Sequence, residues 1–397
     1  MSSGQRNSPS LALGVLALAY YAMCTAGIAM VGAVPAIAHG LGVDLPAIAH
    51  LIAVFSITFA IAAPAIQVLL GHLPRRNLLL GGLLTLLAGT ALSALAPNAE
   101  VLLAARVLTG LGAAAIGPVA SALGASLVPP AQQGRALATV FSGMTIASVL
   151  SVPLAVWVST VLGWRWVYGS AALIALLAVL MVALLITERT PGQRLTLAQL
   201  TGVLRDPAIA AGVAVTTCAL AGMFVIYTFI APLLALRFHA APSMVSSALL
   251  VFGIAGVAGN LVARRIADFW SADRAIAVSL VALIAAYALL GMAPASIPLA
   301  LALLVLWAVA GDVYMPSQQR RLVEMAPQVR GLVLALNSSA LYIGMSVGSS
   351  AAGAAYALRG VAALPGVAIV FLLAALAALW VSRLALRHKV RHPAARA

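Results

Sequence analysis

Asp312 is the acidic side chain best placed to do chemistry inside a membrane. The chain has only eight acidic residues, and Asp312 alone sits well inside a long apolar run, between Leu301 and Pro316. Ionisable groups are costly within a bilayer, so one that is kept there indicates function. Burial favours the neutral form of a carboxyl group, which can then take up and release a proton as its surroundings change. We predict Asp312 as a proton-coupling residue; the alternative is a hydrated side chain about one turn from the end of the run.

The other residues that could carry chemistry fit no enzyme and no ATP-driven motor. A phosphate-binding loop needs a Gly-Lys-Ser/Thr sequence, but the only lysine, Lys389, follows His388. The histidines lack the spacing of metal ligands, and no two carboxyl groups share an apolar run. We therefore expect no enzymatic activity, no metal and no cofactor.

Twelve long apolar runs must position these residues. Each is near or above the ~20 apolar residues that a helix needs to cross the hydrocarbon layer. The sequence therefore predicts an all-α integral membrane protein with twelve transmembrane helices. The runs lie at about 11–38, 47–70, 78–96, 101–127, 136–161, 166–187, 207–235, 244–263, 275–293, 298–318, 331–357 and 363–384.

The basic residues between the runs predict the orientation. Of the 22 Lys and Arg residues, Arg165, Arg237 and Arg359 fall in the loops of one side, and Arg106 falls inside a run. All the others fall on the opposite side, which the positive-inside rule assigns to the cytoplasm together with both termini. Because the charge is spread over short loops and is not gathered on one face, the net charge of +14 does not indicate nucleic-acid binding. The excess of arginine and alanine is typical of a GC-rich bacterial genome, so we expect a bacterial inner membrane.

The chain divides near its middle into two related halves. A polar stretch at 188–206 separates residues 1–187 from residues 207–397, and we predict it as a cytoplasmic linker between two six-helix bundles. Three pairs of residues recur at an offset of 195 to 198 positions, as expected from duplication of a six-helix unit. The pairs are Pro35 and Pro232, Pro118 and Pro316, and Arg135 and Arg330.

Small residues spaced four apart predict where helices pack closely, because lipid supplies no hydrophobic drive for helix association. One such series is Gly344, Gly348 and Ala352, and another runs through Gly110, Ala114 and Pro118.

Several motifs, taken together in their order and spacing, resemble the major facilitator superfamily. The resemblance is to its twelve-span drug:proton antiporter branch and to sugar- or arabinose-efflux-like members, and it covers most of the chain. The motifs occur at 105–112 (ARVLTGLG), 134–143 (GRALATVFSG), 163–166 (GWRW), 227–233 (YTFIAPL), 253–260 (GIAGVAGN) and 337–348 (NSSALYIGMSVG).

This resemblance implies two pseudo-symmetric six-helix bundles that move about a central site, and a monomer that exports a small drug-like or sugar-like solute in exchange for protons. It makes Arg106 a candidate for substrate or proton handling. Tyr227 and Asn337, which lie in matched motifs, are candidate substrate contacts, as are the aromatic residues Phe55 and Trp307, since pockets for amphiphiles are mostly apolar. Asp268, with Arg135 and Arg330, is a candidate latch between conformations.

The sequence departs from the family pattern where proton coupling is concerned. Many relatives carry an acidic residue after a threonine in the first span, but here Thr25 is followed by Ala26, Gly27 and Ile28. Ser151 and Ala155 stand where the antiporter motif of the fifth span has glycines. These departures favour an alternative, a facilitator or substrate-specific exporter without proton coupling. A sensor that no longer transports is a third possibility.

Overall fold

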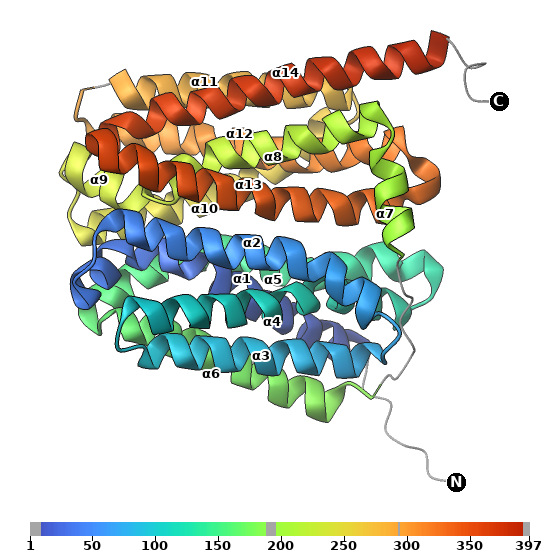
Figure 1. The fold of residues 1–397 in the computed structure, drawn as a ribbon, viewed down its shortest axis with the longest axis horizontal. Coiled ribbons are helices and arrows are strands. Elements are labelled where there is room, and N and C mark those ends of the chain that lie inside the picture. The colour runs from blue at the N-terminus through green and yellow to red at the C-terminus, as the bar shows by residue number, and fades with distance from the viewer. Residues whose placement is uncertain (1–8, 188–195, 293, 392–397) are drawn as a thin grey trace. The chain divides into compact units, whose positions relative to one another are not determined.

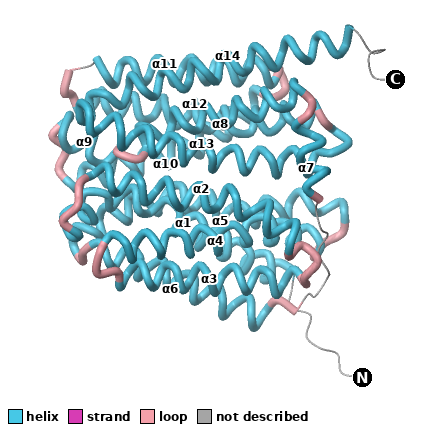
Figure 2. Tube along the Cα trace, viewed as in Figure 1, coloured by secondary structure: helices cyan, strands magenta, loops and turns pink. Residues whose placement is uncertain are grey.

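The computed structural model describes residues 9–187, 196–292 and 294–391 and consists of helices joined by short loops (Figures 1 and 2). No β-strand occurs within these three ranges. The helices of the first half are α1 (Pro9–Leu41), α2 (Leu45–Leu69), α3 (Arg75–Leu95), α4 (Ala99–Ser126), the short 3-10 helix η1 (Pro130–Gln132), α5 (Gln133–Val161) and α6 (Trp164–Leu185).

The second half repeats the pattern of long apolar helices. It contains α7 (Leu197–Leu204), α8 (Pro207–Tyr227), α9 (Ile230–Phe238), α10 (Pro242–Ile266), α11 (Ala272–Met292), α12 (Ile297–Met325), η2 (Pro327–Val329), α13 (Arg330–Arg359), η3 (Gly360–Ala363) and α14 (Leu364–Arg391).

Length and composition make these helices capable of crossing a membrane. Eleven segments of the described chain qualify as candidate spans, and the last of them, Pro327–His388, contains α13 and most of α14. Counting α13 and α14 separately gives the twelve helices that the apolar runs predicted. The protein is a multi-pass membrane protein.

Local sequence explains where several helices begin. Asn98 precedes α4 and accepts a hydrogen bond from the Val101 amide at 2.9 Å, while Asp206 accepts one from the Ala208 amide at 2.9 Å at the start of α8. Both satisfy amides that have no partner within the helix. Between α5 and α6 the chain turns at Gly163, whose φ of 94° suits a residue without a side chain.

The seventh apolar run was predicted as one span, but the structure divides it into α8 and α9. The helix stops at Tyr227 and restarts at Ile230. Pro232 explains the interruption, because it has no amide hydrogen to donate to the carbonyl four residues earlier, at Thr228. At the interruption the Thr228 hydroxyl donates to the Phe224 carbonyl at 2.6 Å.

The described chain forms two compact units. Unit 1 contains residues 9–43 and 61–187, and unit 2 contains residues 44–60 and 196–391. Helix α2 contributes to both, because its residues up to 60 group with unit 2. The linker predicted at 188–206 lies partly outside the described residues, at 188–195, and its remainder forms α7 and the start of α8. The predicted domain boundary therefore stays a prediction.

Candidate transport site

Asp312 lies on α12 and faces α10. Its Oδ1 accepts a hydrogen bond from the Asn260 side-chain amide at 2.7 Å. A Cβ placed on Gly259 would lie 3.0 Å from the Asp312 Cβ, and one on Gly256 would lie 2.5 Å from its Oδ2. The two glycines therefore let α10 approach the carboxyl group closely. None of the three ion pairs formed by the described residues includes Asp312.

An aromatic cluster adjoins Asp312 along the same two helices. The Tyr227 ring of α8 lies 6.0 Å from Phe252 of α10 and 6.2 Å from Trp307 of α12, and Phe252 lies 4.9 Å from Trp307. Phe252 precedes Gly256 by about one helical turn, so the rings and the carboxyl group occupy consecutive levels of the α10–α12 contact. The structure thus brings together three residues selected from the sequence, Tyr227, Trp307 and Asp312.

Phe55 belongs to a different contact. It lies 6.4 Å from the Tyr342 ring of α13, and Phe59, one turn further along α2, stacks on the same ring at 3.6 Å. These rings attach the first part of α2 to α13 within unit 2.

Arg106 is fully buried, and its guanidinium group is directed at the backbone of α1. Nη1 donates to the Ala26 carbonyl at 2.8 Å and Nη2 to the Gly27 carbonyl at 3.3 Å. Tyr168 of α6 is a buried neighbour that interacts with Arg106 electrostatically. These contacts connect α4, α1 and α6, so Arg106 holds helices of unit 1 together whatever else it does.

Asn337 is buried in unit 2 and bonded within the protein. Its Oδ1 accepts a hydrogen bond from the Thr216 hydroxyl at 2.6 Å. Thr216 in turn accepts a hydrogen bond from the Gln318 side-chain amide at 3.0 Å. Asn337 therefore links α13 to α8 and, through Thr216, to α12.

The latch candidates Asp268, Arg135 and Arg330 are all exposed. None of them takes part in an ion pair between described residues. Asp268 and Arg330 belong to unit 2 and Arg135 to unit 1, and the latch stays a prediction.

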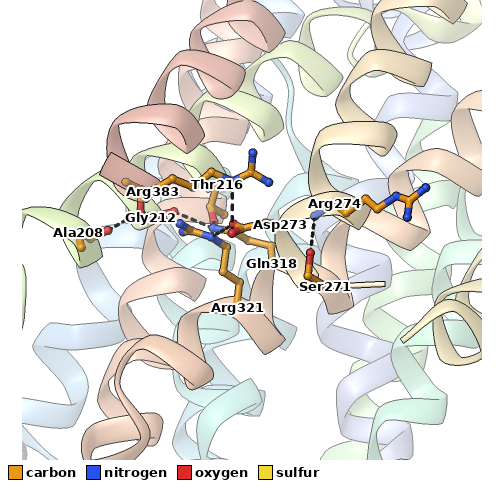
Figure 3. Close-up of polar contacts among 10 residues, drawn as sticks. Ala208, Gly212, Thr216, Ser271, Asp273, Arg274, Gln318, Arg321 and Arg383 are labelled. Atoms are coloured by element: carbon orange, nitrogen blue, oxygen red, sulfur yellow. Dashed lines mark hydrogen bonds and ion pairs between the residues drawn. The ribbon is translucent and has the colours of Figure 1, made fainter. Parts of the chain in front are cut away.

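The sequence analysis missed a charged cluster in unit 2, which Figure 3 shows. Asp273, in the first turn of α11, accepts from Arg321 Nε of α12 at 2.6 Å and lies 3.2 Å from Arg383 Nε of α14. Arg321 Nη2 also donates to the Ser382 hydroxyl at 3.0 Å. One feature of the sequence could have indicated this cluster: all three charged residues lie at the ends of apolar runs, on the side assigned to the cytoplasm.

Comparison with known proteins decides the family of this bundle of apolar helices. The family model described as Major Facilitator Superfamily matches residues 15–215 and again residues 212–396. The chain belongs to the Major Facilitator Superfamily. The match of one model to both halves agrees with the internal repeat read from the prolines and arginines, and the predictions of a transporter and of no enzyme are confirmed.

Individual relatives of this Major Facilitator transporter cover most of its length. The inner membrane transport protein YdhP of Escherichia coli K12 is 29% identical over 88% of both chains. The chloramphenicol resistance protein of Streptomyces lividans is 34% identical over 65% of this chain and 67% of its own. A chloramphenicol efflux pump of Mycobacterium tuberculosis, Rv0191, is 32% identical over 70% of this chain and 68% of its own.

Solved structures confirm the fold. A bacterial homologue of the human lysosomal transporter Spinster, in an inward-facing and unoccupied conformation, has a TM-score of 0.77 at 17% identity and covers 97% of this chain and 99% of its own. A D-xylose-proton symporter has a TM-score of 0.72 at 16% identity, with coverage of 94% and 96%. The all-α major facilitator fold predicted from the sequence is therefore confirmed.

The charged cluster of this transporter has a counterpart in unit 1. Arg76, at the start of α3, donates to the Ile186 carbonyl and, at 2.7 Å, to the Ala183 carbonyl. Asp273 and Arg383 follow Arg76 and Ile186 by 197 residues each. The same two positions thus meet in both units, through a carbonyl in one and through an ion pair in the other.

Proposed function

We propose that this Major Facilitator transporter exports a small amphiphilic solute, either drug-like or sugar-like, in exchange for protons by alternating access. The observation that carries the proposal is Asp312, an acidic side chain within a membrane helix that has an amide partner and takes part in no ion pair of the described residues. The names of two relatives, a chloramphenicol resistance protein and a chloramphenicol efflux pump, support export of a drug-like compound.

Asp312 suits proton coupling because no ion pair with a described residue holds its carboxyl group in the charged form. An apolar environment favours the protonated form, and access to water favours the ionised form. A site that faces each side of the membrane in turn can therefore bind a proton on one side and release it on the other. One charge moved down ~100 mV supplies ~2.3 kcal/mol, and a pH gradient adds to that.

The aromatic cluster is the proposed contact for the apolar part of the solute. Tyr227, Phe252 and Trp307 present ring faces and edges next to Asp312, and amphiphile sites are mostly apolar with a few polar groups. Solute bound there changes how well water reaches Asp312, which couples the two sites. Phe55 and Asn337 are proposed as further contacts. Arg106 is proposed as a residue that positions α1.

The test uses inside-out membrane vesicles that hold a respiration-driven proton gradient. Drugs and sugars are added in turn, and release of protons from the vesicle lumen is followed with a pH-sensitive dye. The wild type is compared with Asp312→Asn and with Glu324→Gln, a matched acid-to-amide change at an exposed position of α12.

We expect a substrate-induced proton release that Asp312→Asn abolishes and Glu324→Gln preserves. A release that survives in Asp312→Asn would place the proton site elsewhere. Equilibration of solute with no proton movement in the wild type would replace the antiporter with the uncoupled facilitator. Neither solute flux nor proton release with any compound would favour the sensor.

We also propose that the protein is a monomer in a bacterial inner membrane with both termini in the cytoplasm. The distribution of basic residues supports this orientation, and similarity to YdhP, an inner membrane transport protein, supports the membrane. Reporter fusions at both termini check the orientation.

A further inference from the structure

Two buried polar atoms in unit 2 have no hydrogen-bond partner among the described residues and are not used by the proposed transport site. They belong to Gln318 and Arg321, which lie three residues apart on α12 and so share one face of the helix. Both side chains are almost fully buried, with exposed fractions of 1% and 3%. Buried polar atoms without partners are rare in folded proteins, and each one requires an explanation.

The hydrogen bonds of Gln318 fix the orientation of its amide. Nε2 donates to the Gly212 carbonyl at 2.6 Å and to the Thr216 hydroxyl at 3.0 Å. A flipped amide would set oxygen against the Gly212 carbonyl, where two acceptors repel each other. Oε1 is therefore an acceptor, and it has no hydrogen-bond partner among the described residues.

Arg321 uses two of its three nitrogens. Nε donates to Asp273 and Nη2 donates to the Ser382 hydroxyl, as Figure 3 shows for the Asp273 bond. Nη1 is buried and finds no acceptor within the described part of the chain. A guanidinium group cannot lose its charge in a protein, so the unmet donor is a charged one.

Gly212 of α8 lies beside these atoms, and its lack of a side chain keeps the position next to Arg321 Nη1 unfilled. A Cβ on Gly212 would lie 3.1 Å from Leu322 Cδ2, 3.3 Å from Arg321 Nη1 and 3.6 Å from the Ser382 hydroxyl oxygen. Two of the three nearest atoms on this side of α8 are polar, and proteins hold internal water where buried polar atoms lack partners.

We propose that one buried water molecule binds between Gln318 Oε1 and Arg321 Nη1, next to Gly212. The water accepts a hydrogen bond from Nη1 and donates one to Oε1. An anion would be repelled by Oε1 and a cation by the guanidinium group, so the site selects a small ligand that both donates and accepts.

The water completes a hydrogen-bonded chain through unit 2. The chain runs from Asn337 through Thr216 and Gln318 to the water, and then through Arg321 to Asp273. It connects α13, α8, α12 and α11, and it ends at a carboxyl group whose side chain is 34% exposed. The water gives both Gln318 Oε1 and Arg321 Nη1 a partner, so a continuous series of polar contacts links the helices that meet here.

The direct test is a map of the wild-type protein at a resolution that shows ordered water. Density for a single water within hydrogen-bond distance of both atoms is the expected result. A direct contact between Gln318 Oε1 and Arg321 Nη1, or an empty space between them, would overturn the proposal.

Substitutions of Gly212 give an independent test in detergent solution. Gly212→Ala fills the space without supplying hydrogen bonds, so its thermal midpoint falls below that of the wild type. Gly212→Ser supplies a hydroxyl group in place of the water, so its midpoint lies above that of Gly212→Ala. The control substitutions are Gly311→Ala and Gly311→Ser on α12. There the nearest atom to an added Cβ is Met223 Cε at 3.9 Å.

At position 311 the alanine variant should be at least as stable as the serine variant, because alanine is the better helix former. A preference for serine at position 212 alone supports the water site. Equal midpoints for the two Gly212 variants, or a preference for alanine there, would contradict it.

Discussion

Arg106 and Asp312 are charged residues of opposite sign within apolar helices, and their surroundings differ. Arg106 donates to two consecutive carbonyls of α1 and has no exposed surface. Asp312 contacts an amide and two glycines of α10. The arginine is thus held by fixed backbone groups, whereas the carboxyl group has partners that tolerate both of its protonation states. This difference supports a positioning role for Arg106 and a coupling role for Asp312.

Arg106→Lys tests the positioning role. The planar guanidinium group reaches both carbonyls at once, and a lysine ammonium is a compact point charge that does not reproduce this geometry. Since a hydrogen bond to a charged group contributes about 1.5–3 kcal/mol, we expect a lower thermal midpoint and a loss of transport at normal expression.

The control for this substitution is Arg165→Lys. Arg165 is exposed and donates to a single carbonyl, that of Ala96, at 3.0 Å, so transport should persist. Unchanged solute flux in Arg106→Lys, measured in the same vesicles, would contradict the role proposed for Arg106.

The packing of α8 against α13 depends on the small residues that the sequence pointed to. An added Cβ would lie 2.9 Å from the Leu220 Cβ at Gly344 and 2.9 Å from the Ala221 Cα at Gly348. The predicted close approach at Gly344 and Gly348 is therefore confirmed. In α4 the structure shows such an approach at Gly112, where an added Cβ would lie 2.9 Å from the Leu86 Cα of α3.

Gly348→Val should separate α8 from α13 and destabilise unit 2. Overpacking of this kind typically costs about 1–3 kcal/mol, and here the obstacle is backbone that cannot move aside. Gly331→Val, on the same helix but with no atom within 4 Å of an added Cβ, is the control. Thermal midpoints in detergent compare the two, and equal losses would show that the α8–α13 contact adapts freely.

Paired hydroxyl groups connect the inner helices of each unit. Thr25 of α1 and Ser151 of α5 lie 2.8 Å apart, and Thr228 and Ser349 of α13 lie 2.9 Å apart. Ser151 was a departure from the glycine expected in the family motif, and this bond gives the residue a structural use. Ser349 follows Ser151 by 198 residues, which matches the offset of the repeat.

The predicted latch concerns the change of the whole transporter between its inward-facing and outward-facing states. Asp268 is exposed, and exposed ion pairs contribute about 0–1 kcal/mol. Asp268→Asn should therefore change the ratio of inward to outward accessibility by no more than roughly fivefold, toward the inward-facing state. Labelling of single cysteines placed on each side measures that ratio.

Glu100→Gln provides the comparison for Asp268→Asn. Glu100 is an exposed acid in the first turn of α4, at the end of the helix that the charge pattern assigns to the opposite side of the membrane. The same accessibility ratio in Asp268→Asn, Glu100→Gln and the wild type would rule out the latch.

The helices could be predicted well because the length and apolar composition of a span are read directly from the sequence. Length and apolar composition mark a span wherever it packs. The break after Tyr227 was not predicted, because Pro232 was interpreted only as a mark of the internal repeat. The contacts of Arg106 could not be predicted from the sequence, because its acceptors are backbone carbonyl groups, which every residue has. The meeting of Asp273, Arg321 and Arg383 depends on which faces of α11, α12 and α14 adjoin, and residue types do not specify this.

The repeated contact at the ends of α3 and α11 has a consequence for ionic strength. In unit 1 Arg76 meets uncharged carbonyl oxygens, and in unit 2 Asp273 meets the oppositely charged Arg383, with about a third of each of these two side chains exposed. Dissolved ions screen the attraction between two exposed charges, but they act little on a short contact between a charge and a dipole. A higher salt concentration therefore weakens the contact in unit 2 more than the corresponding contact in unit 1.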